Sequence, residues 1–347
     1  MDGTASTKKN AEIELLRFLT ALLIVGFHAG VLKGGYLGVE LFFMLSGCLM
    51  AVSMQRYAAQ PLLNHEQLNR ETVDFLKRKL KGFLPELLVT CPLFAAWYSV
   101  LLGVQGESPM ILVANINNFV DDSVLLLRFT GLFPWSDYNI ASWYLSCMML
   151  ASCLLFPLFR RCGYAPYLLA IALLLLGTIV MQSADDWTVC CGVVYKYNIR
   201  AIGGMAVGYF LYPAVQWLKA LALKPWQRCA LSAVKWGCFG MLCCYSALMV
   251  PNEGSILVPI AVMLIIIFAG VGADSSLYQN RVCLFLGRLS LPLYLSHLLF
   301  ANPSFQGWLA AQGAGEKGAV ALVYALSLAL AMLLLPLCAF IRKRLAW

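Results

Sequence analysis

Long apolar segments alternate with short polar ones along almost the whole chain. Each apolar segment is close to the roughly 20 residues that an α-helix needs to cross a hydrocarbon core. Their apolar positions are continuous rather than alternating, which argues against a membrane β-barrel. Because the backbone must satisfy its own hydrogen bonds in lipid, the pattern predicts an all-α, polytopic integral membrane helix bundle of about ten transmembrane helices. The predicted spans are roughly 14–32, 36–55, 83–103, 140–158, 164–182, 198–218, 229–250, 255–272, 284–301 and 318–341.

The composition excludes a water-soluble globular protein. The 347 residues are 61% hydrophobic and 12% charged, and the mean hydropathy is +0.77. Ordinary soluble domains carry roughly 25% charged residues. No internal repeat, low-complexity linker or polar appended domain interrupts the pattern, so we expect a single membrane domain over residues 1–347.

The basic residues predict the orientation of the bundle. Most of the 25 Lys and Arg fall in alternate segments, which include residues 1–13 and the loop 56–82. The intervening segments hold only Lys33, Arg128, Lys196 and Lys317. The positive-inside rule therefore places both termini and the basic loop 56–82 in the cytoplasm. The segment 104–139 becomes an external loop, in which 121–133 is predicted as a short interfacial helix.

The net charge and the cysteines do not indicate nucleic-acid or metal binding. The net charge of +8 follows from the cytoplasmic basic residues, so we expect no nucleic-acid partner. Most of the 13 cysteines lie inside apolar runs, where Cys behaves as a small hydrophobe, and no C-x-x-C is present. With only three distant histidines, no metal site is predicted.

Ionisable residues inside the spans are the first candidates for chemistry, because charged groups in lipid are costly. Arg17 and His28 are eleven residues apart, which returns to within about 20° of the same helix face. They are expected to form a polar track along the first span. The alternative is a snorkelling Arg17 at the interface and a packing His28.

A second polar feature lies in the next predicted span. Glu40 follows small residues at 34, 35 and 38 that allow close approach of backbones. A carboxylate in this apolar segment needs a cation, and we expect an imidazole or guanidinium from the first span to provide it. Alternatively, Glu40 lies at the outer interface.

Five segments, taken in order, resemble the acyltransferase 3 family of membrane-bound O-acyltransferases. The resemblance covers nearly the whole chain, and the R-x10-H spacing of Arg17 and His28 is one part of it. The segments are 13–28, 38–47 (GVELFFMLSG), 75–85 (FLKRKLKGFLP), 142–145 (SWYL) and 286–297 (LGRLSLPLYLSH).

The resemblance implies transfer of an acyl group, usually acetyl from acetyl-CoA, to a hydroxyl of a carbohydrate or cell-envelope glycan in the inner (plasma) membrane. Acyl-CoA is then a donor substrate, and no permanently bound cofactor is expected. His28 is suited to act as base or transient acyl acceptor. Arg17 and Glu40 complete the predicted catalytic group, and Arg17, Arg200, Ser46 or backbone N–H groups are candidates to stabilise the oxyanion.

Other residues are predicted to bind the two substrates. On the donor side, cytoplasmic cations would bind the phosphates of acyl-CoA, although the same basic run is also what a positive-inside flank provides. Arg200 and Arg288 equally suit interfacial roles, and for His297 a packing role is favoured over that of a second base. The donor candidates are Arg78, Lys79, Lys81, Arg288 and Ser46, and the acceptor candidates are Trp143, Arg200, Tyr294 and His297.

The sequence departs from the family pattern at three positions. Gly82 stands where the basic segment often has a second arginine, Met148 where the tryptophan segment often reaches a glutamate, and Leu291 where the last signature has tyrosine. Two other functions therefore stay open. One is a transporter or flippase of envelope lipids or glycans, for which inverted repeats are expected and none is seen. The other is a catalytically impaired relative that acts as a partner.

Overall fold

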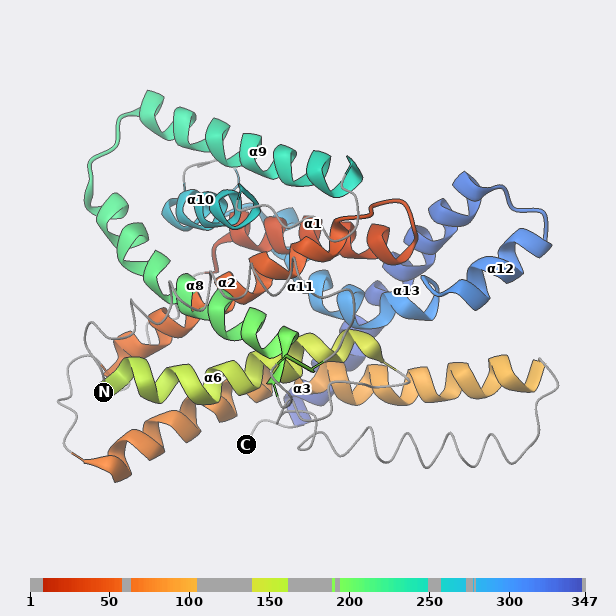
Figure 1. Ribbon diagram of the computed structural model, residues 1–347, viewed down its shortest axis with the longest axis horizontal. Coiled ribbons are helices and arrows are strands. Elements are labelled where there is room, and N and C mark those ends of the chain that lie inside the picture. The colour runs from red at the N-terminus through yellow and green to blue at the C-terminus, as the bar shows by residue number, and fades with distance from the viewer. Residues whose placement is uncertain are drawn as a thin grey trace.

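The computed structural model describes residues 9–57, 64–104, 139–161, 189–190, 194–248, 257–272, 277 and 279–344. The described part is a bundle of helices (Figure 1). The predicted span 164–182, the predicted interfacial helix 121–133 and most of the predicted external loop lie outside the described residues. The helices are α1 (Ala11–His28), α2 (Gly38–Met54), α3 (His65–Val104), α6 (Trp143–Arg161), α8 (Lys196–Ala220), α9 (Pro225–Leu248), α10 (Leu257–Val271), α11 (Arg281–Ser296), α12 (Pro303–Ala311) and α13 (Glu316–Arg344).

Within the described residues, six helical segments are long and apolar enough to cross a membrane. Each predicted span other than 164–182 overlaps a described helix. Helices α1 and α8 are not among the six segments, and α10 is apolar but shorter than a typical span. Membrane-protein character follows from these segments, whereas ten spans and cytoplasmic termini stay predictions. The six segments are Gly35–Tyr57, His65–Trp97, Trp143–Arg161, Pro225–Leu248, Arg281–Leu299 and Glu316–Arg344.

The predicted loop 56–82 is helical over most of its length. After the short 3-10 helix Gln55–Tyr57, the 40-residue helix α3 begins at His65 and continues to Val104. No Gly or Pro interrupts residues 65–81, and Glu66 and Arg70 form an ion pair one helical turn apart, so the charged stretch is itself a good helix former. The basic run therefore lies on a helix that continues into the bundle.

Short elements add details that the hydropathy pattern did not predict. Asn302 caps α12 by accepting from the Phe305 N–H at 2.9 Å, and Pro303 follows at the first helical position. A two-stranded antiparallel pair joins β1 (Val189–Cys190) to β2 (Val194–Tyr195) just before α8. The remaining 3-10 helices are Gly35–Leu37, Ile140–Ser142 and His297–Leu299.

Two glycines bring α2 and α8 into backbone contact. A Cβ on Gly47 would meet the carbonyl of Met205, and one on Gly208 would meet the carbonyl of Met44. Small residues at such crossings are the usual way for membrane helices to pack closely. The contact holds α2 firmly, and α2 carries several side chains of the candidate site.

Helix α1 is held at its beginning by polar contacts. The Asn10 side chain caps α1 by accepting from the Glu12 N–H at 3.0 Å, and its amide donates to the Ala269 carbonyl at 2.7 Å. Glu12 forms a fully buried ion pair with Lys235 of α9. Gly287 of α11 leaves room for Glu14, because a Cβ at position 287 would clash with it. Three neighbouring helices thus fix the position of α1.

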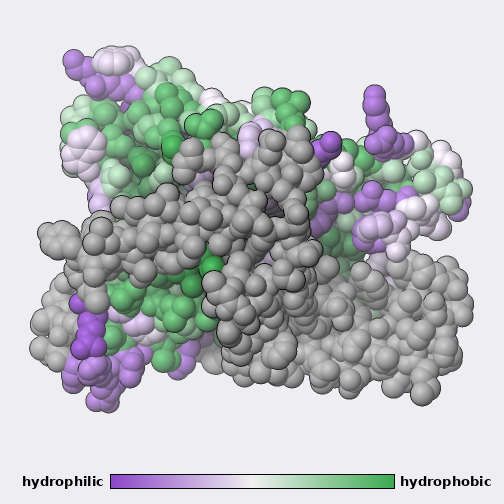
Figure 2. Space-filling view, in the orientation of Figure 1, coloured by the Kyte–Doolittle hydropathy of each residue, from purple (hydrophilic) through white to green (hydrophobic). Residues whose placement is uncertain are grey.

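Helix α9 exposes a row of large apolar side chains. They are Trp226, Val234, Met241 and Leu248. Figure 2 shows green, hydrophobic residues over this region and purple, hydrophilic ones gathered where α9 begins. Such a distribution suits a helix with its side in a bilayer and its end in water.

Candidate functional site

A cavity of about 380 Å³ lies among α1, α2, α3, α6 and α11. Its wall combines apolar side chains with a small number of cations and hydroxyls, as ligand pockets usually do. One end is basic and the other is formed by aromatic and hydroxyl groups. The lining residues are Arg17, Phe42, Leu45, Ser46, Leu49, Met50, Ser53, Arg56, Phe75, Arg78, Lys79, Gly82, Phe83, Tyr144, Leu145, Met148, Ser290, Leu291 and Tyr294.

The basic end carries Arg56, Arg78 and Lys79. Arg78 donates a hydrogen bond to the Tyr57 hydroxyl, and its guanidinium carbon lies 5.7 Å from the centre of that ring. Lys79 lies 5.5 Å from the centre of the Phe75 ring. These aromatic contacts place the cations beside the cavity while their polar atoms stay able to meet an anion.

Neighbouring charges hold this end in shape. Arg160 of α6 donates to Glu71 of α3 at 2.8 Å and to the Tyr57 carbonyl at 3.0 Å. Both Arg160 and Glu71 are largely buried. The pair joins α3 to α6 beside the cavity. Helix α3, which carries Arg78 and Lys79, is therefore held in a fixed position relative to α6.

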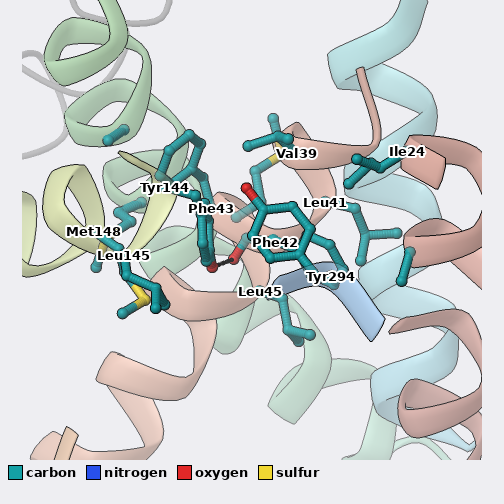
Figure 3. Close-up of a cluster of buried hydrophobic side chains, with 14 of the residues drawn as sticks. Ile24, Val39, Leu41, Phe42, Phe43, Leu45, Tyr144, Leu145, Met148 and Tyr294 are labelled. Carbon is teal, nitrogen blue, oxygen red and sulfur yellow. Dashed lines mark hydrogen bonds between the residues drawn. The ribbon is translucent and has the colours of Figure 1, made fainter. Parts of the chain in front are cut away.

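Hydroxyl and aromatic groups form the deep end of the cavity. Tyr144 of α6 donates to the Phe42 carbonyl at 3.2 Å and shares a hydrogen bond of 3.1 Å with the Ser46 hydroxyl. Ser46 also lies 3.4 Å from the Met148 sulfur. The Tyr294 ring is 5.8 Å from Tyr144 and 6.0 Å from Phe42, centre to centre, and Figure 3 shows the three rings gathered from α6, α2 and α11.

Arg17 reaches the cavity from α1. Its Nη1 donates to both carboxylate oxygens of Glu14, at 3.1 and 3.0 Å. The side chain remains 29% exposed, and it lines the cavity together with Ser290 and Leu291. The ion pair with Glu14 holds the guanidinium in place. Its other N–H groups are left to donate to a ligand in the cavity.

His28 is the last residue of α1 and does not line the cavity. Its ring lies 5.0 Å from the His297 ring, and His297 lies 6.0 Å from Tyr294, centre to centre. The row of three rings connects the deep end of the cavity to His28. His297 is completely buried and its Nδ1 lies 2.7 Å from the Tyr294 carbonyl.

Glu40 and Arg200 form a separate polar cluster on α2 and α8. The two side chains form a largely buried ion pair, and Arg200 also donates to the Tyr36 carbonyl at 3.0 Å. The guanidinium lies 5.7 Å from the Tyr36 ring and 5.9 Å from the Trp143 ring. The sequence predicted a cation from the first span as the partner of Glu40. That prediction is wrong, because Arg17 pairs with Glu14 and α8 supplies the cation.

The structure therefore separates the predicted residues into groups. Arg17, Ser46, Arg78, Lys79 and Tyr294 share the cavity. His28 and His297 adjoin its Tyr294 end, and Glu40, Arg200 and Trp143 form the second cluster. Lys81 is outside the cavity lining, and Arg288 is exposed on α11 and also outside it.

Most lining residues were not among the sequence candidates, and three of them have polar atoms or contacts that bear on the chemistry. Arg56 was treated only as part of a basic flank, and Tyr144 only as part of the SWYL segment. Met148 was noted as a departure from the family, and it touches Ser46 inside the cavity. Tyr144 was detectable, because a tyrosine in a family segment within an apolar run needs a hydrogen-bond partner. Among the described residues, no group of three or more His, Cys, Asp or Glu is placed to hold a metal ion.

Comparisons with known proteins identify the family. Residues 10–340 match the family model for the acyltransferase domain of acyltransferase 3 proteins. A protein of Komagataeibacter xylinus named as a candidate membrane-bound transacylase, BcsY, is 32% identical over 117 residues, which are 31% of this chain and 28% of that relative. The match thus spans well under two thirds of the relative. No solved structure matches the chain. Because the family model spans nearly the whole chain, the protein is a member of the acyltransferase 3 family of membrane acyltransferases.

Proposed function

We propose that the protein is an O-acyltransferase of the inner (plasma) membrane that moves acetyl from cytoplasmic acetyl-CoA to a hydroxyl of a carbohydrate or envelope glycan. The single observation that carries this proposal is the cavity, which has cations at one end and hydroxyls at the other. The name of the BcsY relative, a membrane-bound transacylase, is consistent with acyl transfer.

The cavity suits an acyl-CoA that enters with its acyl group first. The phosphates, which are too polar to cross lipid, would stay at Arg56, Arg78 and Lys79 and form charge-assisted hydrogen bonds. The thinner pantetheine arm would lie along the apolar wall. Its thioester would then reach the end formed by Ser46 and Tyr144.

The reaction needs a base, an oxyanion donor and a leaving group. The acceptor oxygen attacks the thioester carbon while its proton passes to His28, and the carbonyl oxygen becomes an oxyanion. Hydroxyls of Ser46 and Tyr144, or the Arg17 guanidinium, are the nearest candidates to stabilise that charge. The intermediate then expels the CoA sulfur with its bonding electrons, and the sulfur takes the proton from His28.

The geometry adds one requirement to this scheme. Tyr294 lines the cavity and packs against His297, which packs against His28, so the thioester and His28 meet only if the Tyr294 ring moves aside and the substrate passes beside His297. A two-step route, in which His28 carries the acyl group, needs the same movement. The two routes differ in whether an acyl-His28 species accumulates when the acceptor is left out.

The acceptor is proposed to bind beside the cluster of Arg200, Glu40 and Trp143. An aromatic ring with a fixed ion pair offers both a stacking face and hydrogen-bonding groups for sugar hydroxyls. This placement agrees with an acceptor on the side of the membrane opposite to the basic end.

The test is acyl transfer by purified protein in lipid nanodiscs, with radiolabelled acetyl-CoA and an envelope glycan extract. His28→Ala should abolish transfer, whereas His65→Ala should not, since His65 is exposed where α3 begins. Undiminished transfer by His28→Ala would contradict the assigned role. Glycan movement across vesicles without any acyl donor would support the transporter alternative instead.

A further inference from the structure

The most informative feature outside the cavity is the contact between two histidines that are far apart in the sequence. His28 ends α1, and His297 begins the 3-10 helix that follows α11. Their ring centres are 5.0 Å apart and their planes are inclined by 50°. The two rings form no hydrogen bond with each other, and a rotation of the His28 ring or one bridging water molecule is needed to connect them.

The protonation of His297 follows from its partner. Its Nδ1 lies 2.7 Å from the Tyr294 carbonyl oxygen. A carbonyl oxygen only accepts hydrogen bonds, so Nδ1 carries the proton. In the neutral imidazole, Nε2 then has a lone pair and is an acceptor.

That acceptor is left without a partner. The Nε2 atom of His297 is buried and forms no hydrogen bond with any residue in the part of the chain that the structure describes. The whole side chain is 0% exposed. A buried acceptor of this kind is unfavourable by about 1–3 kcal/mol, so a donor is expected when the site is working.

His28 and Tyr294 are both polar rings that pack against His297, and the His28 ring is the nearer of the two, at 5.0 Å against 6.0 Å. Phe27 contacts the His28 ring edge to face at 4.9 Å, and Gln306 donates to the His28 carbonyl at 3.2 Å, so the end of α1 is held in place. His28 itself is only partly buried. One of its nitrogens can therefore face His297 while the other faces a substrate.

We propose that His297 is a positioning residue for His28. Its Nε2 accepts the N–H of one His28 nitrogen, which leaves the lone pair of the other nitrogen directed at the acceptor hydroxyl. When that nitrogen takes the hydroxyl proton, the His297 lone pair stabilises the imidazolium of His28. This arrangement rests on the proposed function, and it has the same logic as the base and orienting group of other acyl-transfer sites.

Two substitutions of His297 separate this role from a structural one. His297→Gln places an amide oxygen near the position of Nε2 but loses the donor to the Tyr294 carbonyl. His297→Asn keeps a donor near Nδ1 and loses the distant acceptor. We expect His297→Asn to lower kcat on the order of 100-fold, within the range for general acid–base catalysis, with KM for acetyl-CoA unchanged, and His297→Gln to retain more activity.

The opposite order would overturn the proposal. If His297 only packs and holds Tyr294, the Asn variant should be the more active of the two, since it keeps that hydrogen bond. Thermal unfolding of both variants in the same nanodiscs identifies any loss that comes from misfolding.

A spectroscopic measurement tests the same idea without any activity. The chain has three histidines, so protein labelled with ¹⁵N-histidine gives three imidazoles to assign, and His65 serves as the exposed reference. We expect a single tautomer at His28 in the native protein and a mixture in His297→Asn. A mixture of tautomers at His28 in the native protein would overturn the proposal, even if acyl transfer is confirmed. A single tautomer that is lost in the variant would support it, even if acetyl-CoA proves not to be the donor.

Discussion

Removal of the Arg78 guanidinium is the sharpest test of donor binding at the basic end of the cavity. Arg78 lines the cavity, whereas Lys77, its neighbour on α3, does not. A hydrogen bond to a charged group contributes about 1.5–3 kcal/mol, and the exposure of Arg78 reduces this to about 1–2 kcal/mol. Arg78→Gln should therefore raise KM for acetyl-CoA about 5- to 30-fold.

The assay is steady-state transfer at fixed ionic strength, with Lys77→Gln as the matched control. Both variants remove one positive charge from the same helix turn, so a general change of surface potential affects them equally. Because phosphate binding is the same in the ground and transition states, kcat should be unchanged in both. Equal KM values for the two variants would refute phosphate binding at Arg78.

Gly82 allows the reciprocal experiment at the same end. Gly82 lines the cavity, and a Cβ placed there meets no atom of the described residues within 4 Å. Gly82→Arg should thus fit without a clash, add a cation where the family often has an arginine, and lower KM for acetyl-CoA. An unchanged KM in a correctly folded variant would show that the phosphates do not approach position 82.

Three further substitutions test the catalytic end and the packing. Ser46→Ala should lower kcat on the order of 100-fold with little change in KM if the hydroxyl stabilises the oxyanion. A kcat equal to that of the native protein would show that another group stabilises the oxyanion. Gly208→Leu should destabilise the protein by about 3 kcal/mol, because a side chain there meets the α2 backbone. Thermal unfolding should show no comparable loss for Gly237→Leu, since a Cβ at position 237 meets no described residue within 4 Å. Lys235→Met should lower the free energy of unfolding by about 3–5 kcal/mol, because Glu12 is left buried without its cation. Chemical denaturation should show that the double variant with Glu12→Leu recovers much of this loss.

The sequence predicted the class of the protein and much of the helix pattern, because both depend on local properties. Apolar runs near 20 residues indicate membrane helices wherever they occur. The fold brings to one cavity five candidates that the sequence had assigned to separate roles: Arg17 as catalytic, Ser46, Arg78 and Lys79 as donor-binding, and Tyr294 as acceptor-side. The helical nature of residues 65–81 was missed because the charged composition was interpreted as a loop, although it lacks helix breakers.

The contacts between distant segments were beyond the reach of hydropathy. Glu40 was expected to pair within the first two spans, but the close α2 and α8 crossing at Gly47 and Gly208 brings Arg200 to it instead. A carboxylate in an apolar setting must find some cation, and local sequence says nothing about which helix will be nearest.

The sequence by itself determined that this chain is an apolar, membrane-type helical protein with the family's ordered motifs, since residue type and spacing alone specify burial, helix period and chemical inventory. Only the tertiary structure decided that the cations and hydroxyls share a cavity while His28 lies beyond it, against His297. That outcome depends on how α1, α2 and α11 cross, and side-chain packing between the helices sets these crossings. The residues in contact are often distant in the sequence: His28 and Gln306, which are joined by a hydrogen bond, are more than 250 positions apart.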